Sequence, residues 1–177
     1  MRIISGVYKG KRIDPGKRFK ARPTTDFAKE GVFNVIVNNF NIEEISVLDL
    51  FAGTGSISFE FASRRCKSID TVELNPLHFG FIKKTASDLN FSQVKVYRAD
   101  YMKFVKQCKK KYSIIFADPP YDMKDVAIVP DVIFKNLLLE PEGWLILEHS
   151  GNHSFTSHRS FFNHKKYGNV NFSIFKM

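Results

Sequence analysis

The sequence predicts an α/β domain built on a mostly parallel sheet of seven strands, with helices on both faces and an antiparallel hairpin at the C-terminal end. Two observations carry this prediction. From residue 46 onward, short apolar runs alternate with segments of helical periodicity, a pattern typical of parallel sheets joined by crossover helices. The chain then closes with two runs of strand character that meet at Gly168 and Asn169. Such a closing hairpin adds an antiparallel edge to the sheet.

The first 44 residues precede this alternation and predict a basic extension of the same domain. We expect, in order, a short hairpin over 1–13 that turns near Gly10, a basic loop over 14–23 and a helix over 24–40. Either Thr24 or Thr25 can cap that helix. Its apolar face is expected to consist of Phe27, Val32, Phe33, Ile36, Val37 and Phe40.

Residues 45–177 are expected to form the sheet and its covering helices. The predicted strands span residues 46–53, 68–74, 93–100, 112–118 and 143–150, followed by the two strands of the closing hairpin within 159–177. The predicted helices between them span residues 56–65, 76–90, 101–111 and 126–138. Pro130 should make the last helix irregular, because proline has no backbone N–H to donate.

The composition is that of a single globular domain with an uneven charge. At 177 residues, 44% of them hydrophobic, the chain can bury a substantial core. The formal net charge is +9, with +7 in residues 1–22 and +4 in residues 150–177, against −2 for the centre. Such asymmetry favours a nucleic acid as partner over a merely soluble basic surface. The candidate contacts are Arg2, Lys9, Lys11, Arg12, Lys17, Arg18, Lys20 and Arg22.

Cysteine content and hydropathy limit the environments that the sequence favours. Cys66 and Cys108 make neither a disulfide framework nor a metal-binding set, so we expect a reducing compartment and no metal. The first residues lack an apolar signal segment, and no apolar run approaches the length of a membrane span. We therefore expect a cytoplasmic protein that does not act on a membrane.

The chemical motifs stand where predicted strands end. In "LDLFAGTGSIS", Gly53 and Gly55 lie between a strand and a helix, where glycine lets the backbone approach a ligand closely. Acidic residues close four successive predicted strands, namely Asp49, Glu73, Asp100 and Asp118. Because ligands of such sheets bind at the carboxyl ends of the strands, these residues predict a ligand site.

Two ligands that contain a ribose fit this pattern, and the charges favour one of them. A dinucleotide needs a helix N-terminus for its pyrophosphate, but Ser58 stands where the dinucleotide fingerprint has its third glycine. Four acids at one edge also repel a pyrophosphate. S-adenosylmethionine is cationic and carries no phosphate, so the acidic edge favours it. The alternative is that the four acids are unrelated strand-end caps.

The stretch "SIIFADPPYD" ends a buried strand in a carboxylate, two prolines and a tyrosine. The Asp118 carboxylate and the Pro119 carbonyl can together accept both hydrogens of an exocyclic NH₂ group and aim its lone pair at a methyl donor. Pro119 and Pro120 restrict the backbone, and Tyr121 offers a ring on which a base can stack. Catalysis would then consist of positioning and electrostatic stabilisation.

These motifs, with "MRIISGVYKGKRI", "RPTTDFAKEGVFNVI" and "GWLILEH", resemble the RsmD family of amino methyltransferases along the whole chain. The resemblance implies a Rossmann-like class I methyltransferase fold. It also implies transfer of a methyl group from S-adenosylmethionine to the exocyclic N2 of a guanine in bacterial 16S ribosomal RNA, with S-adenosylhomocysteine as product. The implied substrate is a small ribosomal subunit particle, and the implied enzyme is a monomer.

The resemblance also implies a role for each motif residue. The methionine end of the cofactor site would be shaped by Asp49, Phe51, Gly53 and Gly55. Glu73 would hold the ribose, Leu74 would pack on the adenine, and Asp100 with Tyr101 would hold the edge of the adenine. The guanine would be held by Asp118, Pro119, Pro120 and Tyr121, and Arg22 with its threonines would border the pocket mouth.

Other functions stay open at this stage. Methylation of another RNA guanine, or of adenine N6 in DNA, uses the same Asp-Pro-Pro-Tyr logic, although DNA enzymes of this kind usually carry an added recognition domain. A non-catalytic RNA-binding assembly protein would keep the fold, but the intact motifs argue against it. An NAD-dependent enzyme is disfavoured by Ser58 and the acidic strand ends.

Overall fold

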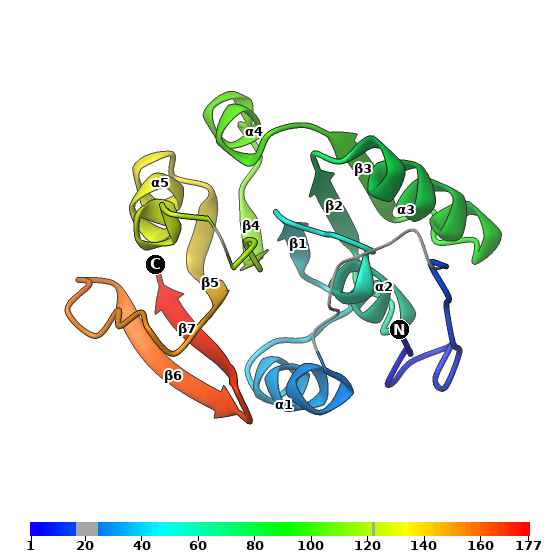
Figure 1. Cartoon of the computed structure of the whole chain (residues 1–177), viewed down its shortest axis with the longest axis horizontal. Coiled ribbons are helices and arrows are strands. Elements are labelled where there is room, and N and C mark those ends of the chain that lie inside the picture. The colour runs from blue at the N-terminus through cyan, green and yellow to red at the C-terminus, as the bar shows by residue number, and fades with distance from the viewer. Residues whose placement is uncertain (17–24, 122) are drawn as a thin grey trace.

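A seven-stranded sheet runs through the computed structural model, which describes residues 1–16, 25–121 and 123–177 (Figure 1). The strands lie in the order β3-β2-β1-β4-β5-β7-β6. Their bounds are β1 Ser46–Asp49, β2 Ser68–Glu73, β3 Val94–Arg98, β4 Tyr112–Ala117, β5 Leu139–His149, β6 Phe161–Tyr167 and β7 Val170–Lys176. Strands β1 to β5 pair in parallel, and β7 pairs antiparallel with both β5 and β6. The predicted sheet, including its closing hairpin, is confirmed.

The helices lie where helical periodicity predicts them, with tighter ends. Their bounds are α1 Asp26–Val37, α2 Ser56–Ser63, α3 Pro76–Asp88, α4 Tyr101–Gln107 and α5 Val129–Lys135, with a 3₁₀ turn η1 at Val126–Ile128. Thr25 caps α1 by accepting the backbone N–H of Ala28, as expected for one of the two threonines. The irregularity expected near Pro130 is the step from η1 into α5, whose first turn contains that proline. None of the helices in the described part of the chain is long and apolar enough to cross a membrane.

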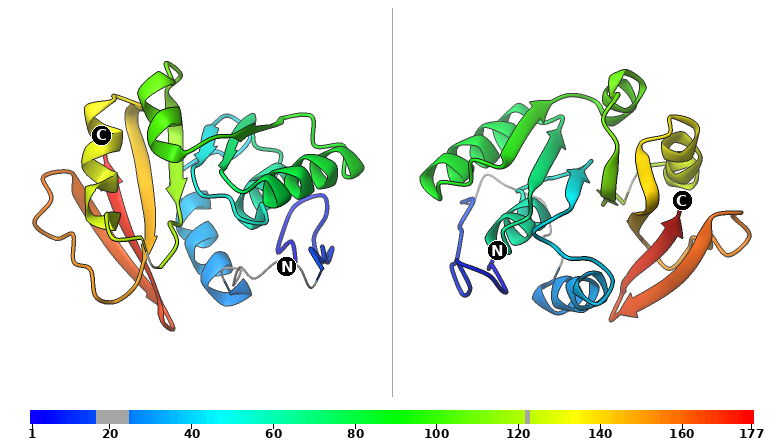
Figure 2. Two further views of the ribbon diagram at one scale, coloured as in Figure 1. Left: turned by 45° about the horizontal axis from the view of Figure 1, so that its top comes forward. Right: turned by 180° about the vertical axis from the view of Figure 1, so that it is seen from behind.

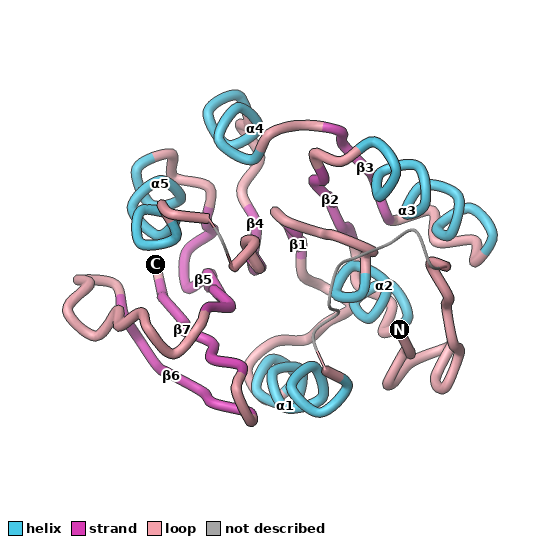
Figure 3. The backbone as a smooth tube through the Cα atoms, viewed as in Figure 1, coloured by secondary structure: helices cyan, strands magenta, loops and turns pink. Residues whose placement is uncertain are grey.

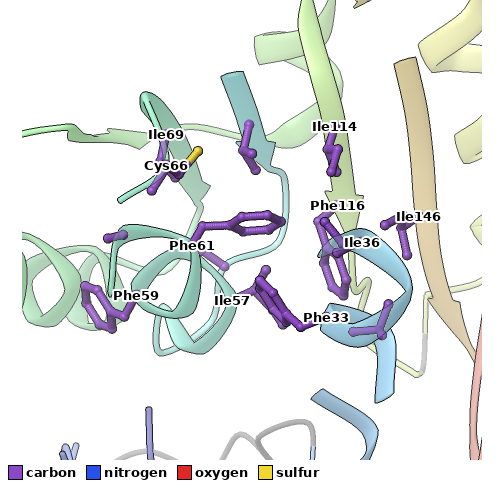
Figure 4. Packing of buried hydrophobic residues seen from close by; sticks show 14 of the residues in the cluster. Phe33, Ile36, Ile57, Phe59, Phe61, Cys66, Ile69, Ile114, Phe116 and Ile146 are labelled. Atoms are coloured by element: carbon purple, nitrogen blue, oxygen red, sulfur yellow. The ribbon is translucent and has the colours of Figure 1, made fainter. Parts of the chain in front are cut away.

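The sheet separates two apolar clusters, because successive strand residues point to opposite faces. In β1, Val47 joins the cluster under α1, α2 and α3, whereas Leu48 joins the cluster under α4 and α5. Figure 4 shows the first cluster, in which side chains of α1 and α2 meet those of β2, β4 and β5. Ile3, Ile13 and Ile42 belong to this cluster too, so residues of the N-terminal 44 share one core with the sheet.

The buried face of α1 differs from the expected one. Phe27 and Val37 are 67% and 42% exposed, so their placement on the apolar face was wrong. Lys29 lies on the buried face instead, at 1% exposure. Lys29 can occupy the buried face because its ammonium donates to the Arg2 carbonyl and the Ser56 hydroxyl. The exposed Phe27 ring lies edge-on to Tyr167 of β6, and α1 packs so closely there that a Cβ at Gly31 would come within 2.3 Å of the Tyr167 ring.

Residues 1–16 fold back on themselves, as the expected hairpin does, but they form no regular strands (Figure 3). One antiparallel bridge joins Arg2 to Arg12, and Gly10 turns the chain with a φ of +82°. This segment is held mainly by α2. Glu60 accepts the backbone N–H groups of Ile4 and Ser5 at 2.7 and 3.0 Å, so the segment lies along the helix (Figure 2).

Candidate active site

The strand order brings the strand-end acids into one row. Strands β3, β2, β1 and β4 are neighbours in that order, and Asp100, Glu73, Asp49 and Asp118 follow or end them. The order along the sheet reverses between β1 and β4, which is where ligands bind in open α/β sheets. The predicted site residues on the sheet therefore lie at one edge, around the junction of β1 and β4.

The glycine turn after β1 requires both of its glycines. Gly53 and Gly55 have φ angles of +54° and +81°, which side chains disfavour. A Cβ at Gly55 would also lie 2.9 Å from the Phe59 ring. The turn therefore keeps its backbone bare at the carboxyl edge of the sheet.

Glu73 holds this turn from the neighbouring strand. Its two carboxylate oxygens accept the backbone N–H groups of Gly53 at 2.8 Å and of Asn75 at 2.7 Å. Each carboxylate oxygen has more than one lone pair, so each keeps an acceptor position beyond these two bonds. Glu73 thus ties the turn to the end of β2 and still presents acceptors to a ligand hydroxyl.

Asp49 lies beneath the turn. It is 1% exposed, and its carboxylate accepts the hydroxyl of Ser58 at 2.6 Å. That hydroxyl also lies 2.8 Å from Thr71 Oγ1. Burial raises the pKa of Asp49 to about 7, the two hydrogen bonds from Ser58 act in the opposite direction, and the charge of Glu73 raises it further. Ser58, noticed in the sequence only as a missing glycine, is the partner of this acid.

The residues expected around an adenine come from three neighbouring segments. Asp100 caps α4 by accepting the backbone N–H of Lys103 at 3.0 Å. Tyr101, the first residue of α4, packs its ring 4.7 Å from that of Phe51 after β1. Leu74, after β2, is 64% exposed. The Phe51 and Tyr101 rings therefore meet between β1 and α4, while Leu74 keeps its apolar surface open.

The Asp-Pro-Pro-Tyr segment follows β4 directly. Asp118 is partly buried, Pro119 is buried, and the Tyr121 side chain is 66% exposed. Burial raises the pKa of Asp118 well above its usual range, and the charges of Glu148 and Asp49 raise it further. The arrangement presents a carboxylate and an open aromatic ring on a loop whose backbone two prolines restrict.

The structure adds a fifth acid to the row. Glu148 lies near the end of β5, is 3% exposed, and accepts the hydroxyl of Tyr121 at 3.5 Å. The sequence motifs gave Glu148 no role, although its signal was available: it stands one residue before the end of β5, and the other four acids stand at or just after the ends of their strands. Because β4 and β5 are neighbours in the sheet, Glu148 lies beside Asp118.

Four of the predicted nucleic-acid contacts lie in the described residues. Arg2, Lys9, Lys11 and Arg12 are exposed on the N-terminal segment, with Arg2 in an ion pair with Asp26 at 2.9 Å. A cavity of about 340 Å³ lies between this segment, α1 and the end of α2, and its lining includes Arg2 and Lys9 from the segment, Arg64 after α2, and Glu30 with Asn34 from α1. The remaining predicted contacts, Lys17, Arg18, Lys20 and Arg22, lie outside the described residues, as does Thr24.

The basic segment is joined to the glycine turn through a buried lysine. Lys29 of α1 donates to the carbonyl of Arg2 at 2.6 Å and to the Ser56 hydroxyl at 3.1 Å, where Ser56 directly follows Gly55. Glu60 lies 4.0 Å from the same ammonium and also pairs with Arg64 at 2.8 Å. Burial lowers the pKa of Lys29, and the charges of Glu60 and Asp26 oppose that shift. The cationic surface and the turn are thus parts of one hydrogen-bonded unit.

His149 follows Glu148 and faces a polar neighbourhood of its own. Its Nδ1–H donates to the Ser150 carbonyl, which can only accept, so Nε2 accepts the Ser173 hydroxyl at 2.8 Å. Burial lowers the pKa of this imidazole. Within the described ranges, no group of three or more His, Cys, Asp or Glu side chains is arranged to hold a metal ion.

Comparison with known proteins places this geometry in a family. The model of the family Conserved hypothetical protein 95, which is the RsmD family, matches residues 1–176. The chain belongs to the RsmD family.

Individual members and solved structures agree with this assignment. The chain is 33% identical over 148 residues to ribosomal RNA small subunit methyltransferase D of Buchnera aphidicola subsp. Baizongia pistaciae, covering 84% of this chain and 75% of that protein. The hypothetical protein TTHA0928 of Thermus thermophilus superposes with a TM-score of 0.88 at 21% identity, over 100% of this chain and 99% of that one. SMU.776, solved in complex with SAH, superposes with a TM-score of 0.68 at 15% identity, over 84% of this chain and 49% of that one.

The fold expectation for this RsmD-family chain is confirmed. The sheet is the expected Rossmann-like one, mostly parallel with an antiparallel β7, and the TM-scores of 0.88 and 0.68 show that the superposed structures share the overall fold. The roles of individual site residues stay predictions. What the structure adds is their arrangement in one row, with the basic segment attached to the glycine turn.

Proposed function

We propose that this RsmD-family protein transfers a methyl group from S-adenosylmethionine to the exocyclic N2 amine of a guanine in small-subunit ribosomal RNA. The observation that carries the proposal is the placement of Asp118 and Tyr121 at the end of β4, beside the glycine turn of β1. Two relationships support the substrate class: the family membership and the name of the Buchnera relative.

The residues at the strand ends fit S-adenosylmethionine better than a dinucleotide. Glu73 and Asp100 make the edge acidic, which suits a sulfonium and an ammonium and repels a pyrophosphate. Ser58 fills the position of the third fingerprint glycine and is committed to Asp49. In this proposal Glu73 holds the ribose, Asp49, Phe51, Gly53 and Gly55 shape the methionine end, and Leu74, Asp100 and Tyr101 hold the adenine.

The chemistry assigned to the Asp118 segment is orientation and proton acceptance. S-adenosylmethionine supplies a methyl group on a positive sulfur, which is a good leaving group. Asp118 and the Pro119 carbonyl accept the two N–H groups of the base amine, which turns its lone pair toward that methyl group. As the N–C bond forms, the amine loses one proton, and Asp118 takes it. The raised pKa of Asp118 makes the carboxylate a better proton acceptor than an ordinary aspartate.

Tyr121 and the basic segment supply the binding of RNA in this proposal. The open ring of Tyr121 stacks on the target base once that base leaves its own stack. Arg2, Lys9, Lys11 and Arg12 contact phosphates from the segment that Lys29 joins to the glycine turn. An assembled small-subunit particle is the proposed substrate, and a monomer the proposed enzyme.

Mapping of modified nucleotides tests the proposal directly. Purified protein, S-adenosylmethionine carrying a labelled methyl group, and small-subunit particles from cells lacking the protein should give one N2-methylguanine in 16S RNA. Naked 16S RNA should be a poorer substrate, and DNA should not be labelled. Label at adenine N6, or binding of NAD in place of S-adenosylhomocysteine in calorimetry, would overturn the proposal.

A further inference from the structure

The register of the sheet sets Glu148 beside the catalytic segment. In the β4–β5 ladder Ala117 pairs with Leu147, so Asp118 and Glu148 are the next residues on two neighbouring parallel strands. Glu148 is 3% exposed, in a strand whose preceding residues Leu145 to Leu147 are wholly buried. Burying an ionised carboxylate in such a place costs free energy unless a partner group pairs with it or donates a hydrogen bond to it.

Tyr121 is one such partner. Its hydroxyl donates to Glu148 Oε1 at 3.5 Å, while the side chain as a whole is 66% exposed. The tyrosine therefore has its polar tip directed inward and its ring surface open to solvent. The prolines before it restrict the backbone, so the remaining freedom of Tyr121 lies in the torsions of its side chain.

The charges around Asp118 come from two strands and have the same sign. Glu148 faces it from β5 and Asp49 from β1, and Tyr121 contributes a hydroxyl from the loop. Burial is the largest cause of the raised pKa of Asp118, followed by Glu148 and then by Asp49. Removal of the Glu148 charge should therefore lower the pH at which Asp118 becomes ionised.

We propose that Glu148 is a positioning residue of the methyl-transfer site, which anchors the Tyr121 hydroxyl so that the ring lies at the stacking position beside Asp118. The inference rests on the proposed function, because the ring needs a base to stack on. Glu148 contacts neither base nor cofactor in this arrangement. It acts through Tyr121 by contact and on Asp118 by charge.

The test compares Glu148→Gln, Glu148→Ala, Tyr121→Phe and the double variant Glu148→Ala/Tyr121→Phe in single-turnover methylation of small-subunit particles. Affinity for S-adenosylhomocysteine and thermal unfolding are measured alongside. Glu142→Gln is the matched control, since Glu142 lies on the same strand but is exposed and pairs with Lys176.

Loss of the anchor should lower the rate with Glu148→Ala and with Tyr121→Phe by about threefold to tenfold each, the range of a single hydrogen bond. The double variant should be no slower than the slower single variant, because both remove the same contact. Glu148→Gln keeps an acceptor, so its rate at high pH should be near that of the unsubstituted protein. The acid limb of its pH–rate profile should move to lower pH, because the Glu148 charge no longer raises the pKa of Asp118.

Three results would overturn the inference. The first is a rate loss in the double variant equal to the product of the two single losses. The second is a pH–rate profile whose acid limb does not move with Glu148→Gln, and the third is a Glu142→Gln variant that behaves like Glu148→Gln. If Glu148→Ala does not fold, Glu148→Gln and Tyr121→Phe still decide through the pH profile and the rate. An unsubstituted protein that binds S-adenosylhomocysteine but methylates no particle contradicts the proposed function instead, so the two failures are distinguishable.

Discussion

The carboxylate of Glu73 accepts the backbone N–H of Gly53 at 2.8 Å, across the gap between the end of β2 and the turn after β1. A second bond, from the N–H of Asn75, holds the same carboxylate in place. One side chain thus fixes the turn that a cofactor approaches and offers the acceptors that a ribose needs. Glu73→Ala removes both roles together, whereas Glu73→Gln can keep the hydrogen bond to the turn while changing the acceptors offered to a ribose.

Glu73→Ala should weaken S-adenosylhomocysteine binding by about 1.5–3 kcal/mol, the scale of a hydrogen bond to a charged group. Glu73→Gln keeps one acceptor for Gly53 and should lose less. Isothermal titration calorimetry measures both. Asp88→Ala removes an exposed carboxylate of α3 that pairs with Lys84, and it serves as the control with unchanged affinity. Equal affinity of the Glu73→Ala and unsubstituted proteins would leave Glu73 as a structural residue only.

Asp118→Ala should stop methyl transfer without stopping cofactor binding. Loss of one preorganised acceptor costs on the order of 10²–10³ in rate. Asp118→Asn keeps an acceptor oxygen, so partial activity should survive, while S-adenosylhomocysteine affinity stays the same for both variants. Single-turnover methylation gives the rates. A full rate with Asp118→Ala would return this residue to the role of a strand-end cap.

Asp49 should make the protein less stable as the pH rises. Its folded pKa of about 7 lies above the value near 4 of an unfolded aspartate, so the folded state binds the extra proton between these pH values. The stability that this proton gives is complete below about pH 4 and is lost as the pH rises through 7. Asp49→Asn mimics the protonated form. It should raise the melting temperature at pH 8 by about 2–4 °C for each kcal/mol gained.

The difference between the Asp49→Asn and unsubstituted proteins should shrink at pH 5, where both carry a neutral side chain. Scanning calorimetry at the two pH values checks this. A gain of the same size at pH 5 and pH 8 would show that the effect comes from packing rather than from charge.

The exposed cations of residues 1–16 should set the salt dependence of RNA binding. Deletion of this segment would also strip buried Glu60 of the N–H groups of Ile4 and Ser5, so point substitutions are the cleaner test. A Lys9→Gln/Lys11→Gln/Arg12→Gln variant should lower the slope of log affinity against log salt by about 2–3, at roughly 0.7–0.9 for each phosphate contact. Filter binding at several salt concentrations measures the slope.

S-adenosylhomocysteine affinity of that triple variant should not change, because the substituted side chains lie outside the strand-end row. Lys84→Gln, on α3, is the control for loss of one surface cation. If the triple variant shows an unchanged slope, these side chains do not contact RNA phosphates and form only a solvated basic surface.

Substitution of two helical glycines by alanine should change the stability of the protein in opposite directions. A Cβ at Gly31 would lie 2.3 Å from the Tyr167 ring, so Gly31→Ala must displace that ring and should destabilise the protein by about 1–3 kcal/mol. Gly80 of α3 has no atom within 4 Å of an added Cβ, so Gly80→Ala should stabilise by up to about 1 kcal/mol. Urea unfolding of both variants gives the comparison. A stabilising Gly31→Ala would show that Tyr167 moves at no cost.

The order and type of the elements in residues 45–177 were predictable from the sequence, because periodicity is a property of short stretches. The alternation of apolar runs and helical segments needs no knowledge of the fold, and the motifs around Gly53 and Asp118 stand at the ends of those stretches. Even the joining residues of the closing hairpin were readable, since Gly168 has the positive φ that a turn there requires.

What only the tertiary structure decided is which of these residues meet, and how deeply they lie. The pairing of β4 with β5 sets Glu148 beside Asp118, 30 positions apart in the chain. The packing of α1 leaves Phe27 exposed at the edge of Tyr167 and buries Lys29 on its hydrogen-bond partners, the Arg2 carbonyl and the Ser56 hydroxyl. The depth of Asp49 beneath the glycine turn raises its pKa. Contacts between distant segments and the loss of water around a side chain depend on the packed sheet as a whole, so no local pattern in the sequence records them.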